Sequence, residues 1–159
     1  SGPGALAVTN IEELNLIVSF DGMGGVGDKP QYQFTVIIET NANPRRPQLA
    51  TPGLKNSLFE LIEVRGTPQA PVAFVIKLNN EKQPITVTKD KPYNRIIGYS
   101  ADLFYPPANQ TFARRRKDQP IHLKDDTETY KIVAINRNEV VLSADSTKKR
   151  TTLKWNSTP

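Results

Sequence analysis

The sequence predicts an all-β domain, an antiparallel β-sandwich with room for one short helix, and three observations support it. Thr, Val and Ile are frequent, and the chain holds 13 prolines and 9 glycines, as is typical of short extended segments joined by turns. Tyr32 to Thr40 alternates apolar and polar side chains. The last third contains three further extended segments separated by short polar turns. A period of two buries one row of side chains and leaves the other in solvent.

The length suits a single domain. With 159 residues, of which 37% are hydrophobic, the chain can bury one substantial core. We expect residues 11–159 to form one sandwich domain. Residues 1–10 are expected to be a flexible segment outside it, because Ser1-Gly2-Pro3-Gly4 looks like a remnant of expression or cleavage. Any membrane association would then depend on a segment missing from the N-terminus.

The first two-thirds of the chain mixes clear strands with ambiguous segments. The expected strands are the second half of Ile11–Phe20, Tyr32–Thr40, Pro71–Leu78, Pro84–Thr88 and Arg95–Tyr105. Asp21 to Pro30 has four glycines and reads as a turn or hairpin loop; a phosphate loop is disfavoured because a strand follows it instead of a helix. Asn41 to Gly53 has three prolines and is expected to be an irregular connection. Ser57 to Val64 fits either helix or strand, and we favour a helical turn leading into a strand.

Residue types with catalytic or metal-binding chemistry are sparse. The chain has no cysteine and a single histidine, His122, so thiolate and multi-histidine sites are excluded. Asp125, Asp126 and Glu128 could hold a hard cation, although acidic residues in a turn are more often solvated. We therefore predict no cofactor, no metal and no enzymatic activity. A pocket lined by Asp102, Asp125 and His122 would reopen the enzyme hypothesis.

The net charge of +5 is unevenly distributed along the chain. Arg114, Arg115, Arg116 and Lys117 stand together, and we expect them to be the partner-binding patch; the competing interpretation is a solvated loop. Aromatic residues lie close to this run in the sequence. This spacing leaves open a second function, a β-barrel that binds single-stranded nucleic acid by charge and stacking.

The C-terminal part resembles a known class of modules, from about residue 98 to residue 155. The segments that carry the resemblance are Tyr105-Pro106-Pro107, Arg114-Arg115-Arg116-Lys117-Asp118, Tyr130-Lys131-Ile132-Val133-Ala134-Ile135, Glu139-Val140-Val141-Leu142-Ser143 and Lys149-Arg150-Thr151-Thr152-Leu153. They are similar to the small periplasmic β modules encoded in type IV pilus and type II secretion gene clusters. The longer first two-thirds departs from those modules and favours a larger sandwich of immunoglobulin-like type.

The resemblance also implies a function. It implies a non-enzymatic structural or assembly component of a pilus-like system in the cell envelope of a Gram-negative bacterium, in the periplasm or at the outer membrane. The expected partners are other envelope or pilus assembly proteins, together with self-association. Strand addition at an open sheet edge is the expected mode of contact.

Overall fold

The computed structural model describes residues 2–24 and 29–156, and this part of the chain is all-β with antiparallel pairing. Its helical elements are two short 3₁₀ turns, η1 (Pro3–Ala5) and η2 (Pro106–Ala108). The strands are β1 (Ala7–Gly24), β2 (Gln31–Ile38), β3 (Arg45–Ala50), β4 (Phe59–Thr67), β5 (Ala70–Leu78), β6 (Ile85–Thr88), β7 (Tyr93–Tyr105), β8 (Gln110–Arg115), β9 (Pro120–His122), β10 (Thr129–Ile135), β11 (Glu139–Ala144) and β12 (Arg150–Lys154). No helix among the described residues combines the length and hydropathy of a membrane-spanning segment.

The chain forms two compact units where the sequence predicts one domain. The central unit comprises Asn15–Ile96, and the terminal unit comprises Ser1–Leu14 with Ile97–Pro159. The boundaries fall inside β1 and β7, so each of these long strands supplies residues to both units. Alternation identifies strands but does not say which of them share a core, and this is why the division is not visible in the sequence.

The N-terminal residues also differ from the expectation. Instead of lying outside the fold, Pro3–Ala5 form η1 and Ala7 begins β1. Leu6, between them, is only 5% exposed and belongs to the core of the terminal unit. The described residues among the first ten are therefore part of the terminal unit.

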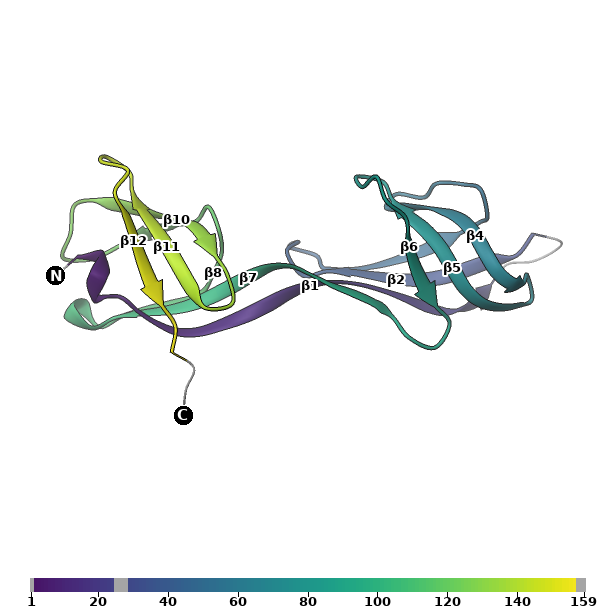
Figure 1. The fold of residues 1–159 in the computed structure, drawn as a ribbon, viewed down its shortest axis with the longest axis horizontal. Coiled ribbons are helices and arrows are strands. Elements are labelled where there is room, and N and C mark those ends of the chain that lie inside the picture. The colour runs from purple at the N-terminus through teal and green to yellow at the C-terminus, as the bar shows by residue number, and fades with distance from the viewer. Residues whose placement is uncertain (1, 25–28, 157–159) are drawn as a thin grey trace. The chain divides into compact units, whose positions relative to one another are not determined.

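The central unit is a two-layer sandwich (Figure 1), and aromatic rings contribute to its core. One layer has the strand order β3-β2-β1 and the other has the order β4-β5-β6. The Phe34 ring of β2 lies 5.4 Å from the ring of Phe59 and 5.0 Å from that of Phe74, so rings from the two layers meet edge to face. Tyr32, Phe34 and Val36 are all buried, and this confirms the predicted alternation of β2.

Two segments of the central unit differ from the sequence prediction. The segment expected to be irregular contains β3, a strand that Pro47 does not break because β3 lies at the edge of its sheet. The segment expected to start with a helical turn contains β4 without one. In β4, Phe59 and Leu61 point into the core as alternate residues, and this pairing outweighs the helical spacing of the neighbouring leucines.

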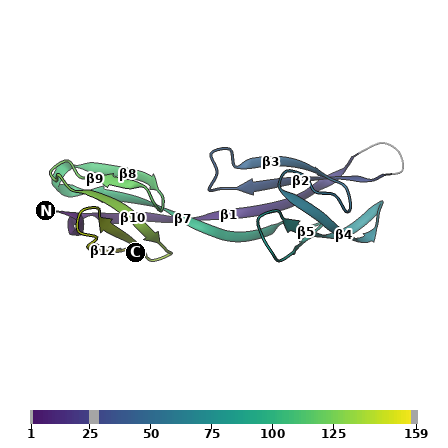
Figure 2. The same cartoon turned by 90° about the horizontal axis from the view of Figure 1, so that it is seen from above.

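In the terminal unit, the C-terminal meander shares a core with the sheet that contains the paired strands β7 and β8, and β9 lies beside β8 (Figure 2). The meander forms a sheet in the order β12-β11-β10-β9, and this confirms the three predicted C-terminal strands. The buried side chains that these sheets share include Leu103, Phe112, Ile121, Ile132, Leu142 and Leu153. Aromatic side chains contribute to both cores, since Phe34 and Phe74 lie in the central unit and Tyr130 and Trp155 in the terminal unit.

Candidate functional site

The predicted basic patch lies at the end of β8, where the β7–β8 register shifts between Ala101 and Leu103. Arg114 adopts a left-handed conformation with φ of 51°. Its backbone N–H donates to the Asp102 carboxylate at 2.7 Å, and this bond holds the bulge in place. The side chains on either side of Arg114 therefore do not follow the regular alternation of a strand.

Arg115 is held against the core. Its guanidinium carbon lies 5.6 Å from the centre of the Phe112 ring, a cation–π distance. The Arg115 Nε is buried without a hydrogen-bond partner among the described residues. The next residue, Arg116, uses its backbone N–H to bind the side chain of Gln119 at 2.9 Å. Of the predicted patch, Arg114 and Lys117 are exposed, while Arg115 packs inward.

The aromatic side chains near the basic run are not available for stacking. Tyr105 is fully buried and Phe112 is only 6% exposed. A single-strand binding platform needs ring faces that a base can reach. Both rings instead contribute to the core of the terminal unit.

The acidic turn between β9 and β10 is tied to two tyrosines. The Tyr105 hydroxyl donates to Asp125 at 2.7 Å, and the Tyr130 hydroxyl donates to Asp126 at 2.5 Å. This second bond is the main cause that lowers the pKa of Asp126, and together with burial it raises the pKa of Tyr130 to about 12. Glu128 accepts from the Ser146 hydroxyl, which is the main cause that lowers the Glu128 pKa.

These carboxylates do not form a metal centre in the described part of the chain. Among residues 2–24 and 29–156, no group of three or more His, Asp or Glu side chains is arranged to hold a metal ion. The three residues that would support an enzyme have separate surroundings. Asp102 binds the Arg114 backbone, Asp125 binds Tyr105, and the His122 ring lies 3.5 Å from the Thr129 hydroxyl.

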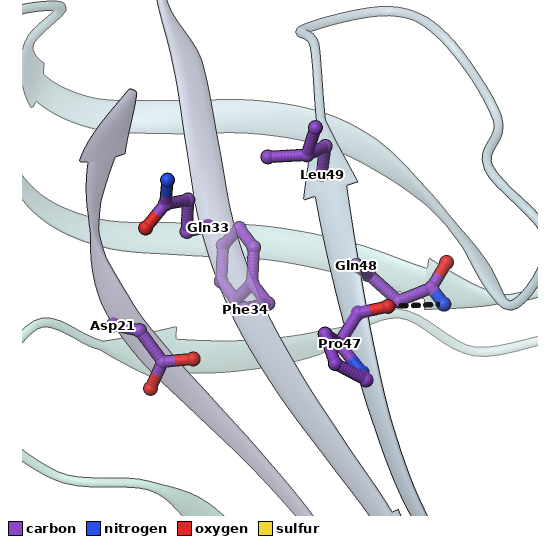
Figure 3. A pocket seen from close by; sticks show the side chains of 6 residues that line it. All are labelled: Asp21, Gln33, Phe34, Pro47, Gln48 and Leu49. Carbon is purple, nitrogen blue, oxygen red and sulfur yellow. Dashed lines mark hydrogen bonds between the residues drawn. The ribbon is translucent and has the colours of Figure 1, made fainter. Parts of the chain in front are cut away.

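The central unit carries a pocket that the sequence did not predict. It has a volume of about 280 Å³ and is lined by Asp21, Gln33, Phe34, Pro47, Gln48 and Leu49. Figure 3 shows these residues on the three neighbouring strands β1, β2 and β3. The register pairs Gln33 with Leu49 and Phe34 with Gln48.

The pairing explains the shape of this pocket. Gln33 and Leu49 form one row on the outer face of the sheet, and Pro47 belongs to the next row. Phe34 pairs with Gln48 between these rows, and its side chain is buried in the core. Asp21 sits at the β1 bulge, where the register shifts between Phe20 and Gly22.

The pocket combines an apolar wall with a fixed carboxylate. Leu49 is 54% exposed and stands beside exposed Pro47 on β3. On the opposite side, the hydroxyl of buried Thr35 donates to the Asp21 carboxylate, which leaves further lone pairs on that carboxylate. Such a site suits a side chain with an apolar stem and a hydrogen-bond donor at its tip.

Comparisons of this chain with protein-family models, curated proteins and solved structures found no match. The candidate site therefore depends on geometry alone. The contribution of β2 to this site could be inferred from the sequence, because the alternation of β2 puts Gln33 and Thr35 on the face opposite Tyr32, Phe34 and Val36. The positions of Asp21 and of the β3 residues could not be inferred in this way, because they depend on a bulge and on the pairing of an edge strand. The glycine-rich loop lies partly outside the described residues, from residue 25 to residue 28.

Proposed function

We propose that this chain is a non-enzymatic structural or assembly component of a pilus-like cell-envelope system and that it acts through protein–protein contacts. The observation that supports this best is the pocket on the outer face of β1, β2 and β3. Exposed apolar side chains beside an oriented polar group are typical of surfaces that bind other proteins.

The expected occupant is a Lys or Arg side chain of a partner protein. Its methylene groups would pack against Pro47 and Leu49, and its charged head would reach Asp21. Thr35 fixes the orientation of Asp21, so little conformational freedom is lost on binding. The site would therefore recognise the partner side chain by both its shape and its charge.

The envelope location rests on the resemblance of the C-terminal meander. The residues that carry it, Tyr130–Ile135 and Glu139–Ser143, lie on the antiparallel hairpin of β10 and β11. In the modules that it resembles, such hairpins belong to proteins that act by contact. We place the chain in the periplasm or at the outer membrane of a Gram-negative bacterium, with envelope proteins as its partners.

Binding of single-stranded nucleic acid receives less support from the geometry. The basic run supplies cations, but Tyr105 and Phe112 are buried beside it. A titration with oligonucleotides at low and moderate salt separates the two functions. Tight binding with a steep salt dependence would favour nucleic acid over the protein-contact function.

Site-specific photo-crosslinking tests the proposal in the cells that encode the chain. A photoreactive residue is placed at Leu49 and, as a matched control, at Val72, which is 57% exposed on β5 of the other layer. We expect position 49 to yield a discrete adduct with an envelope protein and position 72 to lack it.

The adduct should depend on the Asp21 charge. Asp21→Asn keeps an oxygen that can accept from Thr35 but removes the charge, so we expect the yield to fall by roughly tenfold. Asp90→Asn, an exposed turn position in the same unit, should leave the yield unchanged. Equal adducts at both positions, a cytoplasmic partner, or full yield from Asp21→Asn would contradict the proposal.

A further inference from the structure

The free edge of β12 is a second candidate interaction surface, in the terminal unit. β12 is the last strand of its sheet, and among residues 2–24 and 29–156 its one strand partner is β11. The N–H of Ala144 donates to Lys149 at 2.9 Å, and the N–H of Trp155 donates to Asn138 at 2.8 Å. Because antiparallel partners alternate, residues 151 and 153 also face β11, whereas the backbone groups of Arg150, Thr152 and Lys154 face outward.

These outward groups remain accessible. Arg150, Thr152 and Lys154 are all exposed, although η1 lies close to β12. None of the backbone hydrogen bonds found among the described residues uses their N–H or C=O groups. The edge therefore presents a row of unpaired donors and acceptors, which is the template that an additional strand requires.

Two other sheet edges, those of β3 and β9, carry local caps. At β3, Pro47 has no N–H, and the outward carbonyl of Leu49 accepts from the Asn56 side chain at 3.1 Å. At β9, the outward carbonyl of His122 accepts from the Gln110 side chain at 3.0 Å. No hydrogen bond found among the described residues places a side chain on the outward backbone groups of β12 in this way, so its edge is a candidate docking position beside η1.

The β12 edge is also strongly basic. Lys148 and Lys149 precede Arg150 in the turn, and Lys131 lies on the same face two strands away. No ion pair found among the described residues involves any of these four cations, whereas Lys154 pairs with Glu139. The three cations at the start of β12, Lys148, Lys149 and Arg150, therefore attract an anionic partner to the edge.

We infer that the outer edge of β12 binds an extended acidic segment of a partner protein by strand addition. The partner backbone pairs with Arg150, Thr152 and Lys154, and its carboxylates lie near the cations at the start of the strand. This surface is in a different unit from the Asp21 pocket, so it goes beyond the proposed function and can fail or hold independently of it.

The geometry distinguishes this partner from other anions and from a second copy. A nucleic acid offers phosphates to the cations but no peptide backbone to match the alternating N–H and C=O groups. A second copy of β12 that paired antiparallel about Thr152 would set Arg150 opposite Lys154, so like charges would face each other and repel. An acidic polypeptide satisfies both the backbone groups and the charge.

Fluorescence titration with a labelled peptide of alternating Glu and Thr provides the test. Thr152→Pro removes one outward N–H without touching the bonds to β11, and Thr152→Ala is the matched control that keeps this N–H. We expect the peptide to bind the wild-type chain and Thr152→Ala alike. Its affinity for Thr152→Pro should fall by roughly tenfold. Arg150→Gln should weaken binding and flatten its salt dependence.

Amide hydrogen exchange on the wild-type chain keeps the test independent of the folding of any variant. The peptide should slow exchange at Arg150, Thr152 and Lys154, while Thr151 and Leu153 are protected without it. Absence of peptide binding, equal affinity for Thr152→Pro, or no added protection at the three residues would overturn the inference. If a single-stranded oligonucleotide displaced the peptide as well as an unlabelled peptide does, the site would attract anions in general, and the inference of strand addition would be overturned as well.

Discussion

Tyr105 and Tyr130 show how single side chains link the core of the terminal unit to its surface. Both rings are buried, and both hydroxyls reach carboxylates in the turn between β9 and β10. Tyr105 also accepts the N–H of Gly2 at 3.1 Å, which ties the start of the chain to the same point. The acidic turn is therefore held by hydrogen bonds with tyrosine hydroxyls, a structural use of residues that could have suggested a cation site.

The Tyr130–Asp126 bond predicts a pH-dependent stability difference. The pKa of Asp126 in the folded chain is lowered below its ordinary value of 3.8, so the stabilisation is present above that pH and is lost as the pH falls through the lowered pKa. Tyr130→Phe should reduce stability at neutral pH, and the gap to the wild type should close in strong acid. Urea denaturation across the pH range measures the difference in free energy of unfolding between the wild type and Tyr130→Phe. A difference that stays constant into strong acid would contradict this role of the Tyr130–Asp126 bond.

Phe34 lies within the aromatic core of the central unit. Its ring contacts those of Phe20, Phe59 and Phe74. Phe34→Ala should lower the free energy of unfolding by about 3–5 kcal/mol, because a buried ring is replaced by a cavity. Chemical denaturation measures the loss, with the exposed residue Val72→Ala as a control that should change little.

At the scale of elements, the edge strands govern which contacts the molecule can make. In β3 the N–H positions of residues 45, 47 and 49 face outward, because Ile38 donates to Pro44 and the pairing alternates from there. Pro47 removes one of these donors at the middle of the edge. The pocket is thus presented on a strand whose own edge resists further pairing.

Pro47→Val should restore the missing donor and promote self-association. Pro44→Val is the matched control, since its new N–H faces β2 and adds nothing to the edge. Analytical ultracentrifugation should show a larger sedimenting species for Pro47→Val alone, at concentrations where the wild type does not form it. The same sedimentation for the wild type, Pro47→Val and Pro44→Val would mean that Pro47 does not prevent pairing at this edge.

Sequence patterning predicted the elements whose alternation is regular. β2 and the meander of β10, β11 and β12 follow such patterns. β3 was missed because prolines argue against a central strand but are compatible with an edge, and position in a sheet is not a local property. The helical turn expected before β4 was wrong because Leu58 and Leu61 match helical spacing, while pairing with β5 decides the outcome.

The candidate site was less predictable than the strands. The basic run is predicted from the sequence to bind a partner, and this stays a prediction; the left-handed Arg114 and the packing of Arg115 on Phe112 give its side chains different surroundings. The pocket depends on a bulge at Asp21 and on the register of β2 with β3. These features arise from pairing between segments that are distant in the sequence, so no local sequence pattern predicts them.

At the scale of the whole molecule, the chain has two compact units, each with its own candidate contact surface. The central unit offers the Asp21 pocket, and the terminal unit offers the basic edge of β12. Each surface is built on paired strands over a packed core. Such an arrangement suits a component that holds other proteins in place.

Native electrophoresis of gently solubilised envelopes from the cells that encode the chain, followed by immunodetection, tests the protein-contact function directly. We expect the wild-type chain to migrate in a complex with other proteins. Asp21→Asn combined with Leu49→Asp should release the folded chain from that complex. A wild-type chain that migrates alone, or a doubly substituted chain that stays in the same complex, would contradict the protein-contact function.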